Sequence, residues 1–435
     1  MKTVSPNDRR VNRWQNLSIF LLALSAVFLF ANLPLFGVLS DRSLLELARD
    51  RIRRENIVAQ TERSSASLLA LPVRMVYTND FARLGADALT TLSDEFEHAG
   101  TYLGEALGSA YDTEPISEQD FLAALRDEGL YFDFTTSFPS DVLSELLGVS
   151  LTEDGLASVR RMLLSPAGEG DAVLYAQDGA GQSYRFSTAV SSPALVDFLA
   201  ARSGNSADFA FMLGAAYEQL SPYTLVLSDP PPRGTLSATN VLSGSEDAFL
   251  RHAEFNAHTE NRFTESSGTV IVREVSNALY LRPDGTVDYQ GSAAAPDSLY
   301  FVSAADPGAP TLTEAAAAAQ NLASTLLQDV LGDAVLCLSG ASAEGERCEI
   351  SFDLMANGTP IRFSDGSHAV TVTTEGQVVT AFTLKARGYT LTEDTALLLP
   401  FAQAAAIARA WEGAELFVAY VDTGAESVLP AWIAE

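Results

Sequence analysis

The segment NALYLRPDGTVDYQG, residues Asn277–Gly291, decides the fold class. Apolar and polar residues alternate on both sides of a Pro-Asp-Gly sequence, which favours a tight turn, so the segment predicts a β-hairpin. A second segment, HAVTVTTEGQVVTAF (His368–Phe382), has the same alternation around Glu-Gly. The chain therefore contains two predicted hairpins of one kind.

The same order of elements follows each predicted hairpin. The tetrapeptide TLTE occurs at Thr311–Glu314 and again at Thr390–Glu393, where Thr followed by Glu predicts the N-terminal cap of a helix. An Ala-rich helix and two strands are expected next in each copy: DAVLCLSG and RCEISFDL in the first, AELFVAYVD and VLPAWIAE in the second. A hairpin–helix–hairpin unit that occurs twice predicts an α+β architecture with antiparallel sheets.

The last residues, SVLPAWIAE (Ser427–Glu435), are the predicted closing strand of the second repeat. Chain ends are usually polar, so a tryptophan at this place indicates a packed strand. We expect Trp432 in the core and Pro430 at an edge or strand-entry position.

The preceding part of the chain predicts a separate α+β domain over residues 65–230. It contains an expected strand at VRMVYTN, a long helix from LGADAL to GEAL, a helix at SEQDFLAALRDEG, an aromatic strand at LYFDFTTSF, and a hairpin over DGAG followed by the helix SPALVDFLAARS. The proline-rich SDPPPRG (Ser228–Gly234) cannot continue a helix or a central strand and marks the boundary. The two repeats are then expected over residues 235–362 and 363–435.

An apolar segment near the N-terminus predicts a membrane anchor. No charged residue occurs from Trp14 to Ser40, and Leu17–Leu39 is long enough to cross a hydrocarbon core of about 30 Å as a helix. The apolar run is too long for a signal peptide, and its exit, FGVLSDRS, is a poor cleavage site. We expect a cytoplasmic tail over residues 1–16, a transmembrane helix over 17–39, a helical stalk over 40–64, and the bulk of the chain outside a cell membrane crossed once. Basic residues flank both ends of the segment, so their count does not decide the orientation, but long domains after a short first tail are usually translocated.

Three polar side chains interrupt this segment, at Ser18, Ser25 and Asn32. Polar groups within the membrane form hydrogen bonds across helices, so these residues are candidates for partner binding. Hydration at the outer interface, or a bond to its own backbone, is the alternative for Asn32.

The charge and cysteine content limit the function classes. The chain has 435 residues, with 56 acidic against 27 basic side chains and a net charge of −29, which disfavours binding to nucleic acid. Cys337 and Cys348 are predicted at facing positions on two strands. A disulfide and two unpaired core cysteines are both compatible with that arrangement.

The histidines and nucleophiles predict no catalytic centre, no metal site and no cofactor. His252 and His258 lie on one expected helix but about 240° apart around it, which does not suit a ligand pair. His368 has Asp365 and Ser367 beside it, but sequence neighbours of this kind are typical of a turn. Neither a nucleophile elbow of the form G-x-S-x-G nor a phosphate-binding loop is present. A binding module for a cell-wall fragment or lipoprotein, with an apolar groove on residues 65–230, is one alternative. An unrecognised cell-wall hydrolase, in which His368 meets a distant acid and nucleophile, is the other.

The pattern resembles the YycH and YycI proteins of Gram-positive bacteria, and YycH more closely. The residues that carry the resemblance are Leu279–Tyr289, Val370–Phe382, Phe417–Asp422 and Leu429–Trp432, together with the short basic tail and the single crossing. The resemblance implies a non-enzymatic regulator of a sensor histidine kinase similar to WalK (YycG), which controls cell-wall metabolism. It also implies a second regulator of the YycH or YycI type as partner, with contacts made partly through transmembrane helices.

Overall fold

A computed structural model describes residues 71–79, 83–86, 94–147, 149, 156–202, 207–227, 232–294, 298–306 and 309–435. The chain divides into two compact units, residues 1–63 and 64–435, and the described residues all belong to the second. The predicted tail, anchor and stalk, with Ser18, Ser25 and Asn32, lie outside the described residues. Within the part that is described, no helix is long and apolar enough to cross a membrane.

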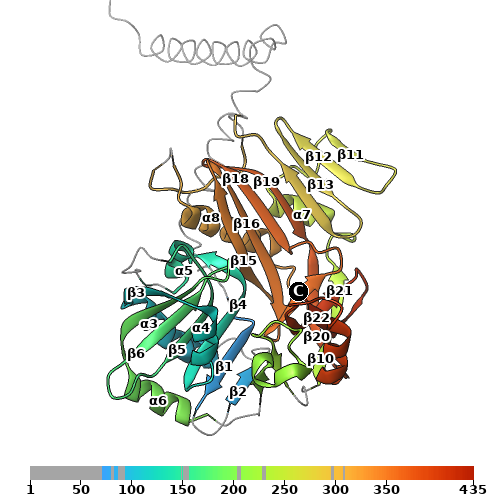
Figure 1. The fold of residues 1–435 in the computed structure, drawn as a ribbon. Coiled ribbons are helices and arrows are strands. Elements are labelled where there is room, and N and C mark those ends of the chain that lie inside the picture. Colours follow the sequence, from blue (N-terminus) through green and yellow to red (C-terminus); the bar gives the residue numbers. More distant parts are fainter. Residues whose placement is uncertain are drawn as a thin grey trace, which may run out of the picture. The chain divides into compact units, whose positions relative to one another are not determined.

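The first half of the described chain forms a seven-stranded antiparallel sheet (Figure 1). Its strands, in spatial order, are β2 (Arg83–Ala86), β1 (Arg74–Thr78), β4 (Gly129–Pro139), β5 (Ser158–Ser165), β6 (Asp171–Gln177), β7 (Ser183–Ser191) and β3 (Tyr111–Ile116). The helices of this half are α3 (Asp94–Gly108), α4 (Glu118–Ala124), α5 (Ser140–Leu147) and α6 (Ser192–Ala200). The hairpin over DGAG and the helices at SEQDFLAALRDEG and SPALVDFLAARS are confirmed.

One predicted helix of this half is too long. The expected helix through LGADAL is wrong at its start, because Arg83–Ala86 is strand β2 and α3 begins only at Asp94. Gly85 lies opposite Val76 of β1 in the antiparallel ladder. Glycine is a weak helix former, so pairing with the apolar β1 decides the local structure here.

A second, thirteen-stranded sheet takes up the rest of the chain. Its spatial order is β11 (Arg262–Thr264), β12 (Val270–Glu274), β13 (Asn277–Leu281), β14 (Thr286–Gln290), β19 (Val378–Lys385), β18 (Val370–Glu375), β16 (Arg347–Ala356), β17 (Thr359–Phe363), β21 (Leu416–Asp422), β22 (Ser427–Ala434), β10 (Arg233–Asn240) and β20 (Arg387–Ala396), with β15 (Ala334–Glu344) on β16. The neighbouring strands are antiparallel except β17 and β21. The helices are α7 (Glu246–His252), α8 (Leu312–Leu327) and α9 (Phe401–Ala408).

The repeated order hairpin, helix, hairpin is present in this sheet. The first copy consists of β13–β14, α8 and β15–β16, and the second of β18–β19, α9 and β21–β22. Thr311 and Glu314 form the expected capping box at the start of α8. Strands from both predicted repeat ranges pair with each other, since β14 lies beside β19 and β16 beside β18.

The second TLTE is not a helix cap, so that prediction is wrong. Thr390–Glu393 belongs to β20, where Thr390 lies opposite Ser237 of β10. Threonine favours extended backbone. Pairing with β10 also gives this segment a series of backbone hydrogen bonds, whereas a helix cap would give it only one or two. The helix of the second copy is displaced and shortened, so that α9 begins at Phe401, directly after Pro400.

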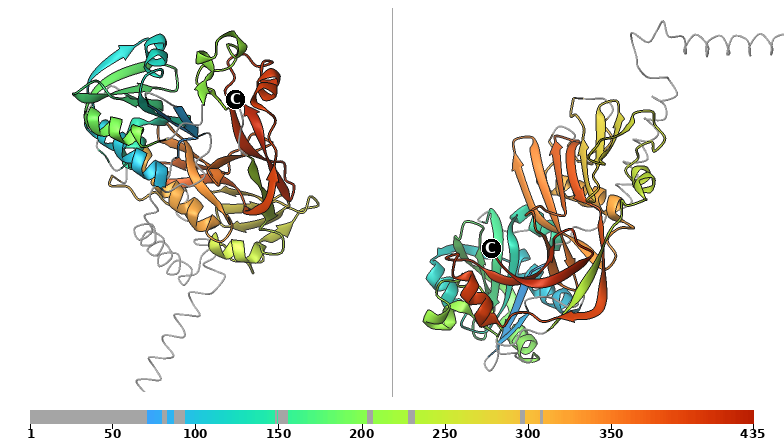
Figure 2. Two further views of the ribbon diagram at one scale, coloured as in Figure 1. Left: turned by 90° about the horizontal axis from the view of Figure 1, so that it is seen from below. Right: turned by 90° about the vertical axis from the view of Figure 1, so that its right-hand side faces the viewer.

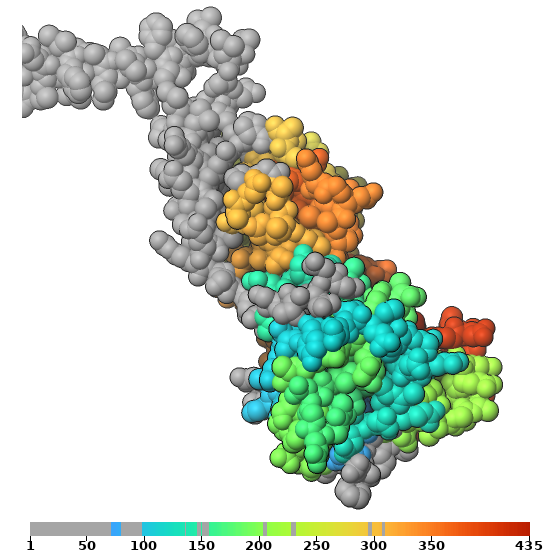
Figure 3. All heavy atoms as spheres, turned by 60° about the vertical axis from the view of Figure 1, so that its left-hand side comes forward, coloured from blue at the N-terminus to red at the C-terminus, as the bar shows by residue number. Residues whose placement is uncertain are grey.

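The two sheets share one hydrophobic core. Phe138 and Leu143 of the first sheet and its helices belong to the same buried cluster as Leu336 and Leu338 of β15. In Figure 3 the atoms of the first half, coloured cyan to green, adjoin the orange atoms of the α8 region.

The segment that connects the two sheets packs against helix α9, near the C-terminal end of the chain. Residues 207–227 contain β8 (Asp208–Phe209), β9 (Leu225–Val226) and the 3-10 turns η2 (Ala210–Met212) and η3 (Gly214–Ala216). Ala210 and Val226 are buried against α9, and Figure 2 shows this light-green segment beside the red C-terminal helix.

Candidate functional site

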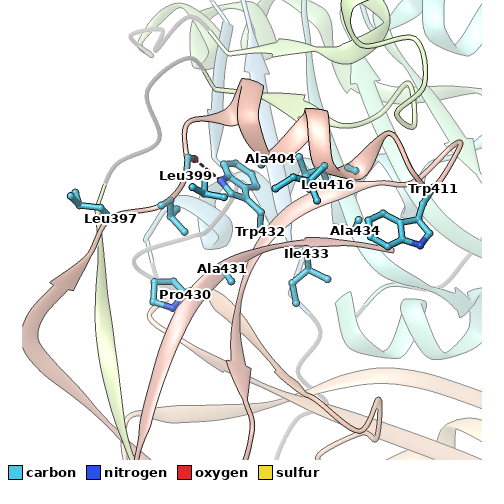
Figure 4. A pocket seen from close by; sticks show the side chains of 13 residues that line it. Leu397, Leu399, Ala404, Trp411, Leu416, Pro430, Ala431, Trp432, Ile433 and Ala434 are labelled. Atoms are coloured by element: carbon cyan, nitrogen blue, oxygen red, sulfur yellow. Dashed lines mark hydrogen bonds between the residues drawn. The ribbon is translucent and has the colours of Figure 1, made fainter.

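An apolar groove of about 480 Å³ lies at the C-terminal end of the second sheet (Figure 4). Four parts of the chain build it: the segment after β20, helix α9 with the turn that follows it, the first residue of β21, and the outer part of β22. The lining residues are Leu397, Leu398, Leu399, Ala404, Ile407, Ala408, Trp411, Leu416, Pro430, Ala431, Trp432, Ile433 and Ala434.

The groove is unusual because large apolar side chains in it face solvent. Leu397 is 90% exposed, Ile407 59% and Trp411 58%. Single exposed apolar residues are ordinary, but a contiguous group of them marks a surface that binds a protein, a membrane or a ligand. Helix α9 buries Phe401 and Ala408 on one face, and Ile407 lies on the other face.

Trp432 occupies one wall of the groove. It is half-buried, and its ring meets that of Phe401 edge-on at 5.3 Å between centroids. Its indole Nε1–H donates to the carbonyl oxygen of Leu399 at 2.8 Å, which holds the segment after β20 against the sheet. The prediction that Trp432 is a core residue is therefore wrong in part, because the ring packs on α9 but also lines an open surface.

A row of charged side chains is buried behind the groove, between the two sheets. Arg74 of β1, Asp133 of β4 and Arg161 of β5 lie at paired positions across three neighbouring strands. Glu415, which immediately precedes β21, reaches this row from the second sheet. The four side chains are at most 10% exposed.

The geometry of this cluster is that of a connected ion network. Arg74 donates to Asp133 Oδ2 at 3.0 Å and also bonds Glu415 Oε1. Arg160 and Arg161 donate to Glu415 Oε2 at 2.9 and 2.5 Å. One carboxylate of the second sheet therefore receives hydrogen bonds from three arginines of the first.

The network shifts the titration of its two acids in opposite directions. Burial opposes ionisation of Glu415, but Arg74, Arg161 and Arg160 outweigh it and hold the pKa of that carboxyl well below its usual range. Burial and the nearby charge of Glu415 raise the pKa of Asp133 above its usual range. Sequence reasoning did not identify this cluster. The sequence feature that could have revealed it is a single charged residue in an otherwise largely apolar strand, as Arg74 is in VRMVYT and Asp133 in LYFDF.

The structure brings His368 to an acid and a hydroxyl, as the hydrolase alternative requires. His368 Nδ1 lies 2.9 Å from Asp353 Oδ1 and 3.3 Å from Ser339 Oγ. In a catalytic triad the acid and the nucleophile bind different ring nitrogens, whereas here both partners meet the same one. Ser339 is also buried, and Asp353 forms a salt bridge with Arg362 at 2.7 Å. This arrangement is not that of a triad, and it links β15, β16 and the loop before β18.

We expect His368 to titrate above the ordinary histidine pKa of about 6.5. Its hydrogen bond to Asp353 favours the charged imidazolium and raises the pKa. Partial burial lowers the pKa, but by less than the hydrogen bond raises it. Its contribution to stability is then present below pH about 6.5 and is lost as the pH rises through the folded-state pKa. An NMR titration of His368 measures this shift, and Asp353→Asn should abolish it while Asp365→Asn leaves it unchanged. A pKa of 6.5 or lower in the unmodified protein would contradict the expectation.

The other candidate residues do not assemble. Cys337 lies opposite Asp353 and Cys348 opposite Ala343, so the two cysteines are not at facing positions and are unpaired. Burial raises the pKa of the Cys337 thiol. His252 ends α7 and His258 lies beyond it, so the expectation of one helix for both is wrong. No group of three metal-ligating side chains occurs among the residues that the structure describes.

These features define an α+β protein whose two large sheets share a core and whose C-terminal strand borders an exposed apolar groove. No family model matches the sequence, and no curated protein sequence matches it.

The fold is YycH-like. The crystal structure of YycH from Bacillus subtilis matches 84% of this chain and 93% of its own chain, with a TM-score of 0.55 and 12% sequence identity. At this identity the likeness establishes the fold. The resemblance noted in the hairpins and the closing strand is thereby confirmed at the level of architecture.

Proposed function

We propose that this protein is a membrane-anchored extracytoplasmic regulator of a sensor histidine kinase, without catalytic activity of its own. The observation that carries the proposal is the YycH-like fold over 84% of the chain. The predicted single crossing and the exposed groove agree with a protein that acts by contacts with other proteins. A second regulator of the YycH or YycI type is the further proposed partner.

Membrane contacts supply a physical route for such regulation. A helix that associates more strongly with one state of a kinase than with the other shifts the equilibrium between them by the difference in binding free energy. Ser18, Ser25 and Asn32 are the side chains proposed to make these contacts from the segment Leu17–Leu39.

An anchor exchange tests this proposal. Replacing Leu17–Leu39 with an unrelated spanning helix should preserve membrane localisation and abolish regulation, because an anchor needs only hydrophobicity whereas an interface needs particular side chains. The measurement is kinase-dependent transcription in the native host, with protease accessibility of the outside domain in spheroplasts as the control. Regulation at the native level by the exchanged anchor would show that the transmembrane contact is not required.

A single substitution gives a finer test of the same contact. Asn32→Leu should weaken association with the kinase by about 1 kcal/mol, or roughly fivefold, if its amide bonds across helices. The measurement is a membrane pull-down with the full chain. An unchanged yield would indicate that Asn32 is hydrated or bonded to its own backbone.

The alternative of a binding module remains a second candidate, although its expected location does not coincide with the groove. That hypothesis expects a groove on residues 65–230, whereas the groove described above is formed by residues 397–434. A surface of this composition suits an apolar partner segment more than a glycan, since its lining is dominated by Leu, Ile, Trp and Ala side chains.

A further inference from the structure

Strand β22 has an open edge along the groove. It pairs with β21 from Leu429 to Ala434, but with β10 only at Ser427 and Val428. On its other side β10 pairs with β20 along its whole length, from Arg233 opposite Ala396 to Asn240 opposite Arg387. Among the described residues, no strand pairs with the outer side of Pro430–Ala434.

The register shows which backbone groups face this open side. Glu415 and Glu435 exchange both backbone hydrogen bonds, at 2.7 and 3.1 Å. Bonded and non-bonded pairs alternate in an antiparallel ladder, so Ile433 and Ala431 bond β21, whereas Pro430, Trp432 and Ala434 point away from it. The N–H donors and carbonyl acceptors of Trp432 and Ala434 are therefore directed to the open edge.

Such an edge is a template for another strand. Exposed edges pair with extended chains, and natural proteins usually cover, shorten or charge them. The edge of β22 carries no charge between Leu429 and Ala434, and apolar side chains lie beside it. Figure 4 shows the groove extending from Leu397 and Pro430 at one end to Trp411 and Ala434 at the other.

The charges around the groove select the occupant. Glu393 and Asp394 precede Leu397, Glu412 follows Trp411, and all three acids are exposed. The nearby bases are engaged elsewhere: Arg409 donates to the carbonyl oxygen of Ala216, and Arg362 bonds Asp353 and Glu435. A strand bound here would therefore meet an acidic rim at each end.

We propose that the edge of β22 binds an extended segment of a partner protein, with apolar side chains at alternate positions and Lys or Arg at its ends. The segment adds a strand to the sheet through the backbone of Trp432 and Ala434, and its apolar side chains enter the groove beside Ile407 and Trp411. Backbone pairing supplies part of the affinity, and the alternate side chains and basic ends supply the specificity.

A second copy of this chain is a poorer occupant. Pairing two β22 edges would bring together two acidic rims on chains of net charge −29. Pro430 also lacks the N–H that a self-complementary ladder would use at this position. The inference rests on the proposed function only in that the occupant is a protein, and it names the surface that such a partner contacts.

The experiment uses the full chain in lipid nanodiscs and a fluorescent synthetic peptide, Arg-Arg-Thr-Val-Thr-Val-Thr-Arg, followed by anisotropy. Empty nanodiscs are the blank. We expect saturable binding that weakens as salt is added, weaker binding of the same peptide with Glu in place of Arg, and loss of binding when its amides are N-methylated at alternate positions. Equal binding of the N-methylated peptide, or no binding of any peptide at millimolar concentration, would overturn the proposal.

Variants locate the site. Trp411→Ser should weaken binding by at least about tenfold, as expected for an exposed aromatic anchor. Ala434→Pro removes one edge-facing N–H without touching the bonds to β21 and should weaken binding by about fivefold, the effect of one hydrogen bond. The matched control is Phe263→Ser on β11, which is 53% exposed and lies outside the groove, and its affinity should equal that of the unmodified protein.

The remaining outcomes are also decisive. If a melting curve shows that Trp411→Ser is unfolded, Ile407→Ser replaces it, since that side chain is 59% exposed. Unchanged affinity in the groove and edge variants would overturn the inference, as would a dimer in sedimentation that Trp411→Ser dissociates. Peptide binding combined with normal regulation by the exchanged anchor would leave this inference standing and remove the transmembrane part of the proposed function. Absence of peptide binding combined with loss of regulation by the exchanged anchor would overturn this inference and leave the transmembrane part of the proposed function standing.

Discussion

Glu415→Gln should destabilise the protein by about 3–5 kcal/mol, because it leaves buried arginines without their acid. The carboxylate of Glu415 bonds Arg74, Arg160 and Arg161, and the substitution leaves Asp133 as the remaining acid of the network. Native proteins are stable by only about 5–15 kcal/mol, so the loss is a large fraction of the total. The midpoint and slope of the urea denaturation curve of the full chain measure this loss of stability.

Two comparisons separate the network from other effects of this substitution. Glu412→Gln changes an exposed acid three residues away and should alter stability by less than about 0.5 kcal/mol. Adding Arg160→Gln to Glu415→Gln should cost less than the two single changes together, since the double variant removes one of the uncompensated charges. Strict additivity would show that Glu415 and Arg160 do not interact.

Acid should act in the same direction as the Glu415 substitution. The pKa of Glu415 in the folded protein lies below its ordinary value of 4.5, so its contribution to stability is present above that pH and is lost as the pH falls below it. The protection factors of the amide hydrogens at β1 and β21, which are corrected for the intrinsic pH dependence of exchange, should then fall at low pH in the unmodified protein, and this fall should be smaller in Glu415→Gln. An equal fall in both proteins would contradict the assignment to Glu415.

Gly388→Ala should cost about 3 kcal/mol, because there is no room for a side chain where β20 crosses the loop after α8. A Cβ atom at Gly388 would lie 2.2 Å from the carbonyl oxygen of Val330, which is backbone and cannot rotate away. The crossing is held by two hydrogen bonds, from Asp333 N to Tyr389 O at 2.7 Å and from Tyr389 N to Leu331 O at 3.1 Å. The added methyl group must separate these segments.

The matched control for Gly388→Ala is Gly340→Ala on β15. There the nearest side-chain atom, Ser351 Cβ, would be at 3.8 Å, an ordinary contact. We expect Gly340→Ala to lie within about 1 kcal/mol of the unmodified protein. Equal urea midpoints for the two variants would contradict the steric argument. Because Leu397–Leu399 follow β20, Gly388→Ala should also weaken peptide binding at the groove.

Sequence reasoning succeeded where the local pattern and the tertiary structure agree. Alternation around Pro-Asp-Gly and Glu-Gly predicted both hairpins, since a strand with one buried face repeats every second residue and its turn needs particular residues. Thr311 and Glu314 predicted a cap because the capping box involves only neighbouring residues. The same reasoning failed at Thr390, where an identical tetrapeptide pairs with β10, a strand more than a hundred residues earlier in the chain.

The sequence by itself determined the fold class, the repeated order of elements and the resemblance to YycH, because these depend on short-range periodicity. The candidate site was decided by tertiary structure alone. Arg74, Asp133 and Glu415 are far apart in the chain and meet only through strand register. Among the described residues β10 pairs with β22 only at Ser427 and Val428, and Trp432 lies half-buried against Phe401 of α9. Each of these depends on which distant strand or helix covers a surface, and no local pattern records that choice.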